Sequence, residues 1–288
     1  MSLSPRARPP EPGGTAGSTG PVGPDAPVIL HATDNGVSWI ALNRPAARHA
    51  ITPELRERLI SGLADASADP AVRAVVITAS GPAFCAGADL RAASAEGARA
   101  RLPGDVSRVV RQGAQRLIGA VLDCEKPVLA AVNGVAAGLG AHLAFACDLV
   151  LAGERARFTE VFVRRGLVPD GGGAYLLPRL VGPQRAKELM FFGEDVTAAE
   201  ARRLGLVNRV VPDGELAATA RAWAGRLAAG PTRALALAKQ LVNASLDGDR
   251  SAAFAAEAAA QEINMSTADA REGIASFLER RDPQYRGR

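Results

Sequence analysis

The sequence predicts an α/β fold that is followed by an all-helical C-terminal region. Short apolar runs typical of buried strands alternate with helix-periodic segments as far as about residue 212. After Pro212 the chain contains only Ala-rich segments with helical periodicity. We therefore expect a core over residues 27–212 and a helical region over residues 213–288. The preceding residues 1–26 are rich in Pro and Gly and lack the apolar surface that ordering requires, so a disordered tail is expected.

The first elements of the core are a hairpin and a helix. Val28–Ala32 and Val37–Leu42 are strand-like runs on either side of Asp34-Asn35-Gly36, which is a hairpin signal. Thr52 is a good helix-capping residue, and Pro53 suits the first helical position. Leucines at near-helical spacing follow, which indicates a helix packed against the core.

The next elements are two buried strands and a glycine-rich turn. Ala74–Thr78 and Val128–Val132 consist almost wholly of apolar residues, as expected of strands that are covered on both faces. Gly138 and Gly140 allow a tight turn and a close approach of the backbone to a ligand. His142 follows near a helix start, where free N–H groups can bind a negative oxygen.

Four helices are predicted beyond the core, separated from one another by Gly, Pro or Asp. They are expected over Glu215–Ala229, Thr232–Ala244, Ser251–Asn264 and Ala268–Arg281. Within the core, Arg91–Arg111 is rich in Ala and Arg without a clear period. We expect an irregular segment there.

The composition argues against several classes of protein. The formal net charge of +4 comes without a dense basic tract or aromatic interleaving, which does not favour nucleic-acid binding. No apolar run has the length of a membrane span, and the N-terminus does not resemble a signal peptide. We interpret Cys85, Cys124 and Cys147 as buried thiols in a reducing compartment and expect a cytoplasmic protein. The three His lie outside any metal-binding pattern, so no metal site is expected.

Two glycine-rich turns are the strongest indication of chemistry. Gly81–Leu90 (G-P-A-F-C-A-G-A-D-L) follows the strand Ala74–Thr78, and Asn133–His142 (N-G-V-A-A-G-L-G-A-H) follows the strand Val128–Val132. Two turns of this kind can direct two backbone N–H groups at one carbonyl oxygen. Removing a proton beside a thioester leaves an enolate oxygen, which two preset donors stabilise.

Five motifs, in this order, resemble the crotonase superfamily, also called the enoyl-CoA hydratase/isomerase family. They are L-N-R-P at Leu42–Pro45, F-C-A-G-A-D-L at Phe84–Leu90, K-P-V-L-A-A-V-N-G at Lys126–Gly134, A-C-D-L-V-L-A at Ala146–Ala152 and R-E-G-I-A-S-F at Arg271–Phe277. The resemblance implies a ββα spiral core and a helical C-terminal region that builds a homotrimer or hexamer. It also implies an acyl-CoA thioester substrate, with no cofactor other than the coenzyme A of that substrate.

The resemblance implies particular site residues as well. The backbone N–H groups of Ala88 and Leu139 match the oxyanion donors. The family usually has Gly at the position of Leu139, but this departure leaves the backbone donor in place. The positions that match substrate or CoA contacts are Arg48, Ala86, Gly87, Asp89, Leu90, Gly138 and Phe162.

The acid and base positions depart from the hydratase pattern. Hydratases of the family use two glutamates, and these positions match His142 and Phe162. Phe cannot accept a proton, and one His does not replace a pair of carboxylates. Asp170 matches a catalytic Asp of other relatives, among them isomerases of the phenylacetate pathway, which also have Phe where Phe162 stands. One carboxylate can take a proton and return it, so we expect enoyl-CoA isomerisation with Asp170 and His142 as catalytic residues.

Other interpretations remain open. Hydratase activity, or acyl-CoA binding without catalysis, is compatible with the resemblance. Asp170 could cap a helix, His142 could be a structural core residue, and Glu160 could line the pocket or lie on the surface. Cys85 is interpreted as a small packed side chain, because no partner base is evident. Arg280–Arg281 could contact a CoA phosphate or form a solvated helix end.

Overall fold

The computed structural model describes residues 26–91 and 102–288. The tail predicted for residues 1–26 lies outside this part of the chain, apart from its last residue. Within the described ranges, no helix is long and apolar enough to cross a membrane.

The larger of two sheets has six strands in the order β1-β2-β3-β5-β7-β10. The hairpin of β1 and β2 is antiparallel, as predicted, and the other neighbouring pairs are parallel. The strands are β1 (Ile29–Asp34), β2 (Val37–Leu42), β3 (Ala74–Ala79), β5 (Val128–Val132), β7 (Leu149–Gly153) and β10 (Arg209–Val211).

The smaller sheet has four short strands in the order β4-β6-β8-β9. They are β4 (Ala83–Cys85), β6 (Val135–Ala137), β8 (Arg157–Thr159) and β9 (Asp195–Thr197). From β3 to β8, successive strands alternate between the two sheets, so each turn of the chain adds one strand to each sheet. This is the spiral that the resemblance implies, and it stacks the ends of β4 and β6 side by side.

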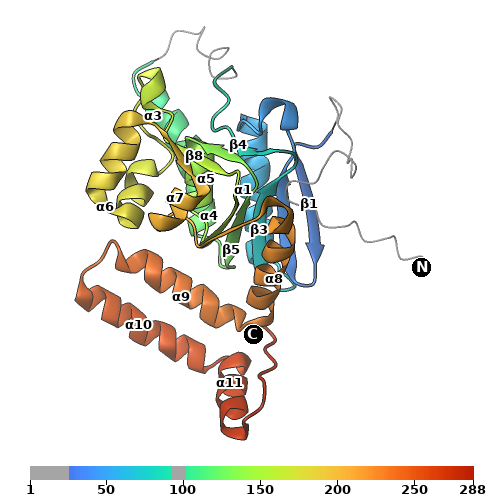
Figure 1. The fold of residues 1–288 in the computed structure, drawn as a ribbon. Coiled ribbons are helices and arrows are strands. Elements are labelled where there is room, and N and C mark those ends of the chain that lie inside the picture. Colours follow the sequence, from blue (N-terminus) through green and yellow to red (C-terminus); the bar gives the residue numbers. More distant parts are fainter. Residues whose placement is uncertain (1–25, 92–101) are drawn as a thin grey trace.

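Helices cover the sheets on both sides (Figure 1). The first of them, α1 (Pro53–Ala68), is capped as predicted, because Thr52 Oγ1 accepts the N–H of Leu55. The helices of the core are α1 (Pro53–Ala68), α3 (Asp105–Val110), α4 (Arg116–Leu122), α5 (Leu139–Phe145), α6 (Gly173–Phe192) and α7 (Ala198–Arg203). Short turns of other helix types are η1 (Pro45–Ala47), η2 (Arg111–Gln115), η3 (Val163–Arg165) and η4 (Asp213–Glu215).

The prediction of an irregular segment over Arg91–Arg111 is wrong for its C-terminal part. Asp105–Val110 forms α3, and residues 92–101 lie outside the described ranges. Asp105 accounts for the helix start, because its Oδ2 accepts the N–H of Leu102 at 2.8 Å and its charge lies in the first turn. A short helix of six residues gives too little periodicity to be recognised in the sequence.

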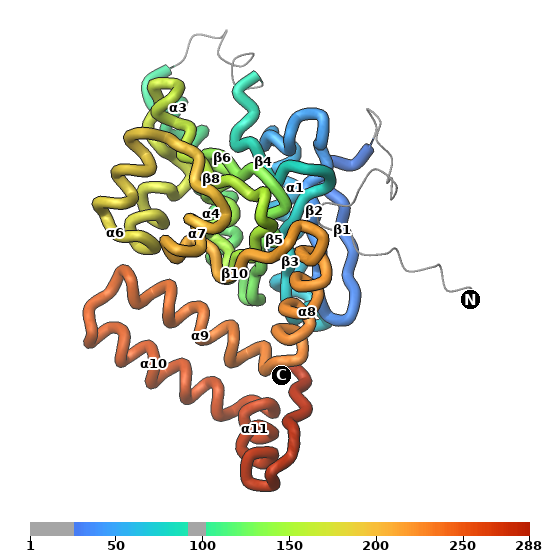
Figure 2. Tube along the Cα trace, in the orientation of Figure 1, coloured from blue at the N-terminus to red at the C-terminus, as the bar shows by residue number. Residues whose placement is uncertain are grey.

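Four helices follow β10, close to the predicted ranges. They are α8 (Leu216–Ala229), α9 (Thr232–Ser245), α10 (Arg250–Met265) and α11 (Ala268–Glu279). Figures 1 and 2 show α8 against the larger sheet, whereas α9 and α10 run side by side away from it. Ala220 and Ala224 of α8 pack on Trp39, Val76 and Leu129, on the face of the larger sheet away from the main core cluster.

A partly buried ion pair fastens α9 to the core. Lys239 Nζ lies 2.9 Å from Asp148 Oδ2 and donates to the carbonyl of Val121 at 3.0 Å. The same Asp148 oxygen accepts the N–H of Val128 at 2.7 Å. The acidic residue of A-C-D-L-V-L-A therefore joins β5, β7 and α9, and its role in this fold is structural.

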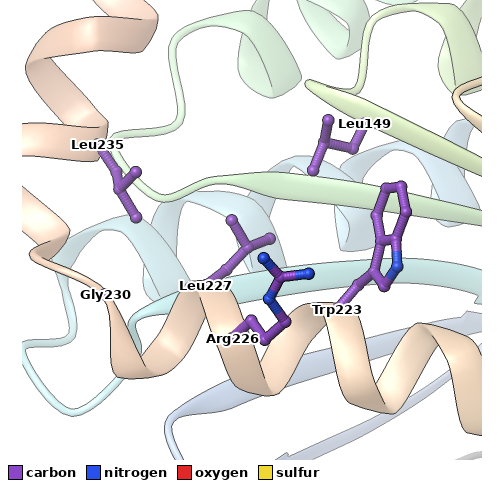
Figure 3. Close-up of a pocket in the computed structure, with 6 residues that line it drawn as sticks. All are labelled: Leu149, Trp223, Arg226, Leu227, Gly230 and Leu235. Carbon is purple, nitrogen blue, oxygen red and sulfur yellow. The ribbon is translucent and has the colours of Figure 1, made fainter. Parts of the chain in front are cut away.

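An apolar cavity of about 340 Å³ lies where β7, α8 and α9 meet (Figure 3). Its lining residues are Leu149, Trp223, Arg226, Leu227, Gly230 and Leu235. None of the predicted site residues is among them, so this cavity is separate from the glycine-rich turns.

Candidate active site

The first glycine-rich turn directs the backbone N–H of Ala88 away from the neighbouring residue Ile51. Ile51 forms an isolated parallel bridge with Ala88, in which its N–H donates to Gly87 O at 2.8 Å and its carbonyl accepts the N–H of Asp89 at 3.0 Å. Because both flanking bonds go to Ile51, the N–H of Ala88 itself points to the opposite side. The backbone of Gly87 has φ 92°, which favours glycine.

The second turn brings its own donor to the same place. Gly138, with φ 51°, is the N-cap of α5, so Leu139 supplies the first N–H of that helix and has no partner one turn earlier. A Cβ on Gly87 would lie 3.5 Å from the nitrogen of Leu139 and 2.7 Å from Ala137 O. The structure thus brings Gly87, the residue before Ala88, close to Leu139.

Two neighbouring residues hold the turns at this separation. Asn133 Nδ2 donates to Ala79 O at 3.0 Å and to Gly81 O at 2.6 Å, which ties the end of β5 to the turn after β3. At Gly134 a Cβ would lie 1.9 Å from Pro82 O. The N-G pair of the motif is therefore a spacer between the two turns, a role that sequence reasoning missed.

The predicted substrate-contacting residues lie around the first turn and at the start of α5. Arg48 is exposed, and its carbonyl accepts the N–H of Ala86 at 2.9 Å. Leu90 is 46% exposed. Asp89 pairs with Arg44 at 3.2 Å, so its side chain fastens the segment after β2 to the turn.

His49 is a buried residue of this region that sequence reasoning did not single out. Its Nδ1 accepts the N–H of Arg44 at 3.0 Å, and its Nε2 lies 2.8 Å from Ser80 O. Burial lowers the pKa of His49 to about 4, and the charge of Arg44 acts in the same direction. In the sequence, His49 belongs to no recognisable motif, so nothing there indicated that it is buried.

We expect the His49 contribution to stability to disappear in mild acid. Its folded-state pKa of about 4 lies below the ordinary histidine pKa of 6.5, so the unfolded chain takes up a proton first. The contribution is complete above pH 6.5 and is lost as the pH falls towards 4. Its size is about 3 kcal/mol. Urea unfolding of wild type and His49→Gln checks this, because their difference in unfolding free energy should shrink over that range. A constant difference would contradict the assignment.

His142, Phe162 and Glu160 form a compact group beyond the second turn. His142 is fully buried in α5, and its Nε2 lies 3.0 Å from both carboxyl oxygens of Glu160. Phe162 stacks on the imidazole, with ring centroids 5.4 Å apart and an angle of 11° between the planes. The surface interpretation of Glu160 is wrong, because it is only 4% exposed. The two positions that the resemblance matches to the hydratase glutamates therefore hold stacked rings.

Asp170 lies next to this group, at the start of a turn made of three glycines. It does not cap α6, because Gly172 is the N-cap and no side chain bonds to the helix end. Burial raises the pKa of the Asp170 carboxyl. A half-buried carboxyl without a capping function is a candidate acid or base.

The cysteines behave as predicted. Cys85, Cys124 and Cys147 are buried and free. Burial raises the pKa of Cys85 to about 12, and its Sγ donates to His49 O at 3.3 Å. A thiol of that kind is not a nucleophile at neutral pH. In the described residues, no group of three or more His, Cys, Asp or Glu could hold a metal ion.

Comparisons with known proteins agree with this geometry. Residues 32–288 match the family described as "Enoyl-CoA hydratase/isomerase". The chain is 41% identical to a "Probable enoyl-CoA hydratase" of Rhodobacter capsulatus, over 90% of this chain and 98% of that protein. It is 36% identical to the "1,2-epoxyphenylacetyl-CoA isomerase" of Escherichia coli, over 90% of this chain and 98% of that one.

The fold is also similar to that of a crystal structure from this family. A putative enoyl-CoA hydratase from Streptomyces coelicolor superposes with a TM-score of 0.86 at 37% identity, covering 95% of this chain and 98% of that chain. The family match spans both sheets and the C-terminal helices. The chain is therefore an enzyme of the enoyl-CoA hydratase/isomerase family, within the crotonase superfamily.

Proposed function

We propose that this enzyme moves the double bond of an enoyl-CoA through a thioester enolate, with Asp170 as the proton shuttle. Asp170 takes a proton from the carbon beside the thioester, and the electron pair moves onto the carbonyl oxygen. The N–H groups of Ala88 and Leu139 stabilise that oxygen. The protonated Asp170 then returns the proton two carbons further along, and the double bond forms in its new position.

The observation that carries this proposal is the placement of Asp170. It is the carboxyl that the structure leaves half-buried beside His142 without a capping role. Phe162 and His142 occupy the two hydratase glutamate positions and stack on each other, which removes the carboxylate pair that hydration uses. The E. coli relative named 1,2-epoxyphenylacetyl-CoA isomerase supports isomerisation of a CoA thioester in general.

Hydration is the second candidate function. The relative from Rhodobacter capsulatus is named a probable hydratase and is 41% identical to this chain. For this chemistry His142 with Glu160 would have to activate water, since Phe162 has no proton to exchange.

An assay of the purified enzyme discriminates these functions. The substrates are matched 3-enoyl- and 2-enoyl-CoA thioesters of several chain lengths, and the products are identified by mass. We expect each substrate to convert to its positional isomer with no change in mass. A product heavier by one water, formed at an ordinary enzymatic rate, would establish hydration instead. Tight thioester binding without any product would indicate a binding protein.

We also propose that the C-terminal helices assemble three chains, or two sets of three. Their outer faces carry exposed apolar side chains, namely Val242, Leu246, Phe254, Ile263, Met265, Ile274, Phe277 and Leu278. An apolar surface of this kind marks an interaction site. Sedimentation should give a mass that is three or six times the chain mass of 29.7 kDa, and a monomer would contradict the assignment.

A further inference from the structure

A buried hydrogen bond fixes the orientation of His142. Its Nε2 lies 3.0 Å from Glu160 Oε1 and 3.0 Å from Oε2, and the two side chains are 0% and 4% exposed. One nitrogen at equal distances from both oxygens is the geometry of an N–H donated to a carboxylate. The proton of the imidazole is thereby placed on Nε2.

Packing prevents the ring from turning. Phe162 stacks on one face of the imidazole. A Cβ on Gly173 would lie 2.3 Å from Cε1 and from Nε2, so the backbone of this glycine closes off the edge of the ring. The imidazole therefore has one orientation, and Nδ1 has one direction.

Nδ1 is left without a partner. It is one of two buried side-chain polar atoms in the described residues that make no hydrogen bond, the other being Asn133 Oδ1. A buried acceptor of this kind costs free energy unless a donor reaches it.

The turn Asp170–Gly173 is the segment against which Nδ1 lies. Cβ atoms on Gly171 and Gly173 would be 3.7 and 3.1 Å from it. Because these positions are glycines, no side chain at either of them stands between Nδ1 and Asp170, the residue that opens the turn.

We propose that Glu160 is a positioning residue, which holds His142 so that Nδ1 accepts a hydrogen bond from Asp170 once that carboxyl has taken the substrate proton. The assignment rests on the proposed function of Asp170. The proton passes from the substrate carbon to Asp170, whose new O–H donates to Nδ1, and it later leaves for the second carbon. Glu160 and His142 neither gain nor lose a proton in the cycle.

The resting tautomer can be measured without any substrate. The chain has three His, so labelling histidine with ¹⁵N gives three imidazoles, and His49 supplies an internal reference. His49 Nδ1 accepts a hydrogen bond and its Nε2 faces a carbonyl, which makes it an Nε2–H tautomer. Two-bond ¹⁵N–¹H spectra at neutral pH should give His142 the same pattern, with a bare Nδ1. A protonated Nδ1 would overturn the proposal.

Kinetics test the coupling to Asp170. Glu160→Gln should lower kcat for double-bond migration on the order of 10- to 100-fold. Loss of a carboxylate that orients a histidine has an effect of this size in metal sites. KM should stay unchanged, because Glu160 does not touch the substrate in this scheme. In an Asp170→Asn background the same change should have no further effect, which is the signature of two residues that act as a unit.

Two comparisons keep the result interpretable. Glu188→Gln makes the same change at an exposed residue of α6 that pairs with Arg185, and it should leave kcat unchanged. An equal loss from Glu160→Gln with and without Asp170 would show a merely structural role and overturn the proposal. If no substrate undergoes double-bond migration, the proposed function fails, but the imidazole spectra of the wild type and of Glu160→Gln still decide whether Glu160 sets the tautomer of His142.

Discussion

Replacing Asp170 with Asn is expected to lower kcat for double-bond migration by about 100- to 10,000-fold. Asn keeps the size of the side chain but cannot take a proton, so the enolate can no longer form through this position. Binding of the CoA thioester should persist, because the proposed oxyanion donors are backbone groups that the change does not touch. Asp65→Asn, on the exposed side of α1, is the matched control and should leave turnover unchanged.

The pH dependence gives the same assignment a second test. The carboxyl must be ionised to act as a base, and burial raises the pKa of Asp170 above its usual 3.8. As the pH falls through this raised pKa, Asp170 becomes protonated and kcat/KM for the isomerisation should decline. The residual rate of Asp170→Asn should lack that acid limb. A limb that is present in both proteins would belong to another group, and unchanged turnover in the variant would rule Asp170 out as the base.

The largest effect on stability is expected from Gly134→Ala. The added Cβ would lie 1.9 Å from Pro82 O, 2.8 Å from Pro82 C and 2.9 Å from Ala83 Cα. All three are backbone atoms of the first glycine-rich turn, so no side chain can move aside. We expect a loss of about 4 kcal/mol or more in the free energy of unfolding. Urea denaturation measures it.

A glycine in open space provides the control for that change. Gly225 lies within α8, is exposed and has nothing within 4 Å of its would-be Cβ. Gly225→Ala should therefore raise the free energy of unfolding by about 0.5 to 1 kcal/mol through helix propensity. Similar losses in both variants would mean that the close approach at Gly134 is not the cause. Any Gly134→Ala protein that folds should also lose activity, because its two turns are forced apart.

Periodic elements could be predicted from the sequence because their pattern is local. Val128–Val132 is a strand with the predicted bounds, and the helix that follows Thr52 has the predicted cap. The short helix Asp105–Val110 escaped recognition, since six residues give too little periodicity to be recognised in the sequence.

Only the parts of the site that belong to sequence motifs could be predicted. The two turns that contain Ala88 and Leu139 are recognisable by their glycine content, and the structure brings these turns together. His49 and Asn133 were missed because their hydrogen bonds reach backbone groups about thirty and fifty residues away. Partners at that separation leave no pattern in one sequence.

By itself, the sequence determined the class of fold and the two glycine-rich turns, which are properties of local composition and spacing. The match of His142 and Phe162 to the hydratase glutamates is what the family resemblance implies. Only the tertiary structure decided that Glu160 is a buried partner of His142, and that Nδ1 lies unpaired against the turn that Asp170 opens. The physical reason is that burial and hydrogen-bond direction arise when the end of β8, α5 and the start of α6 pack together.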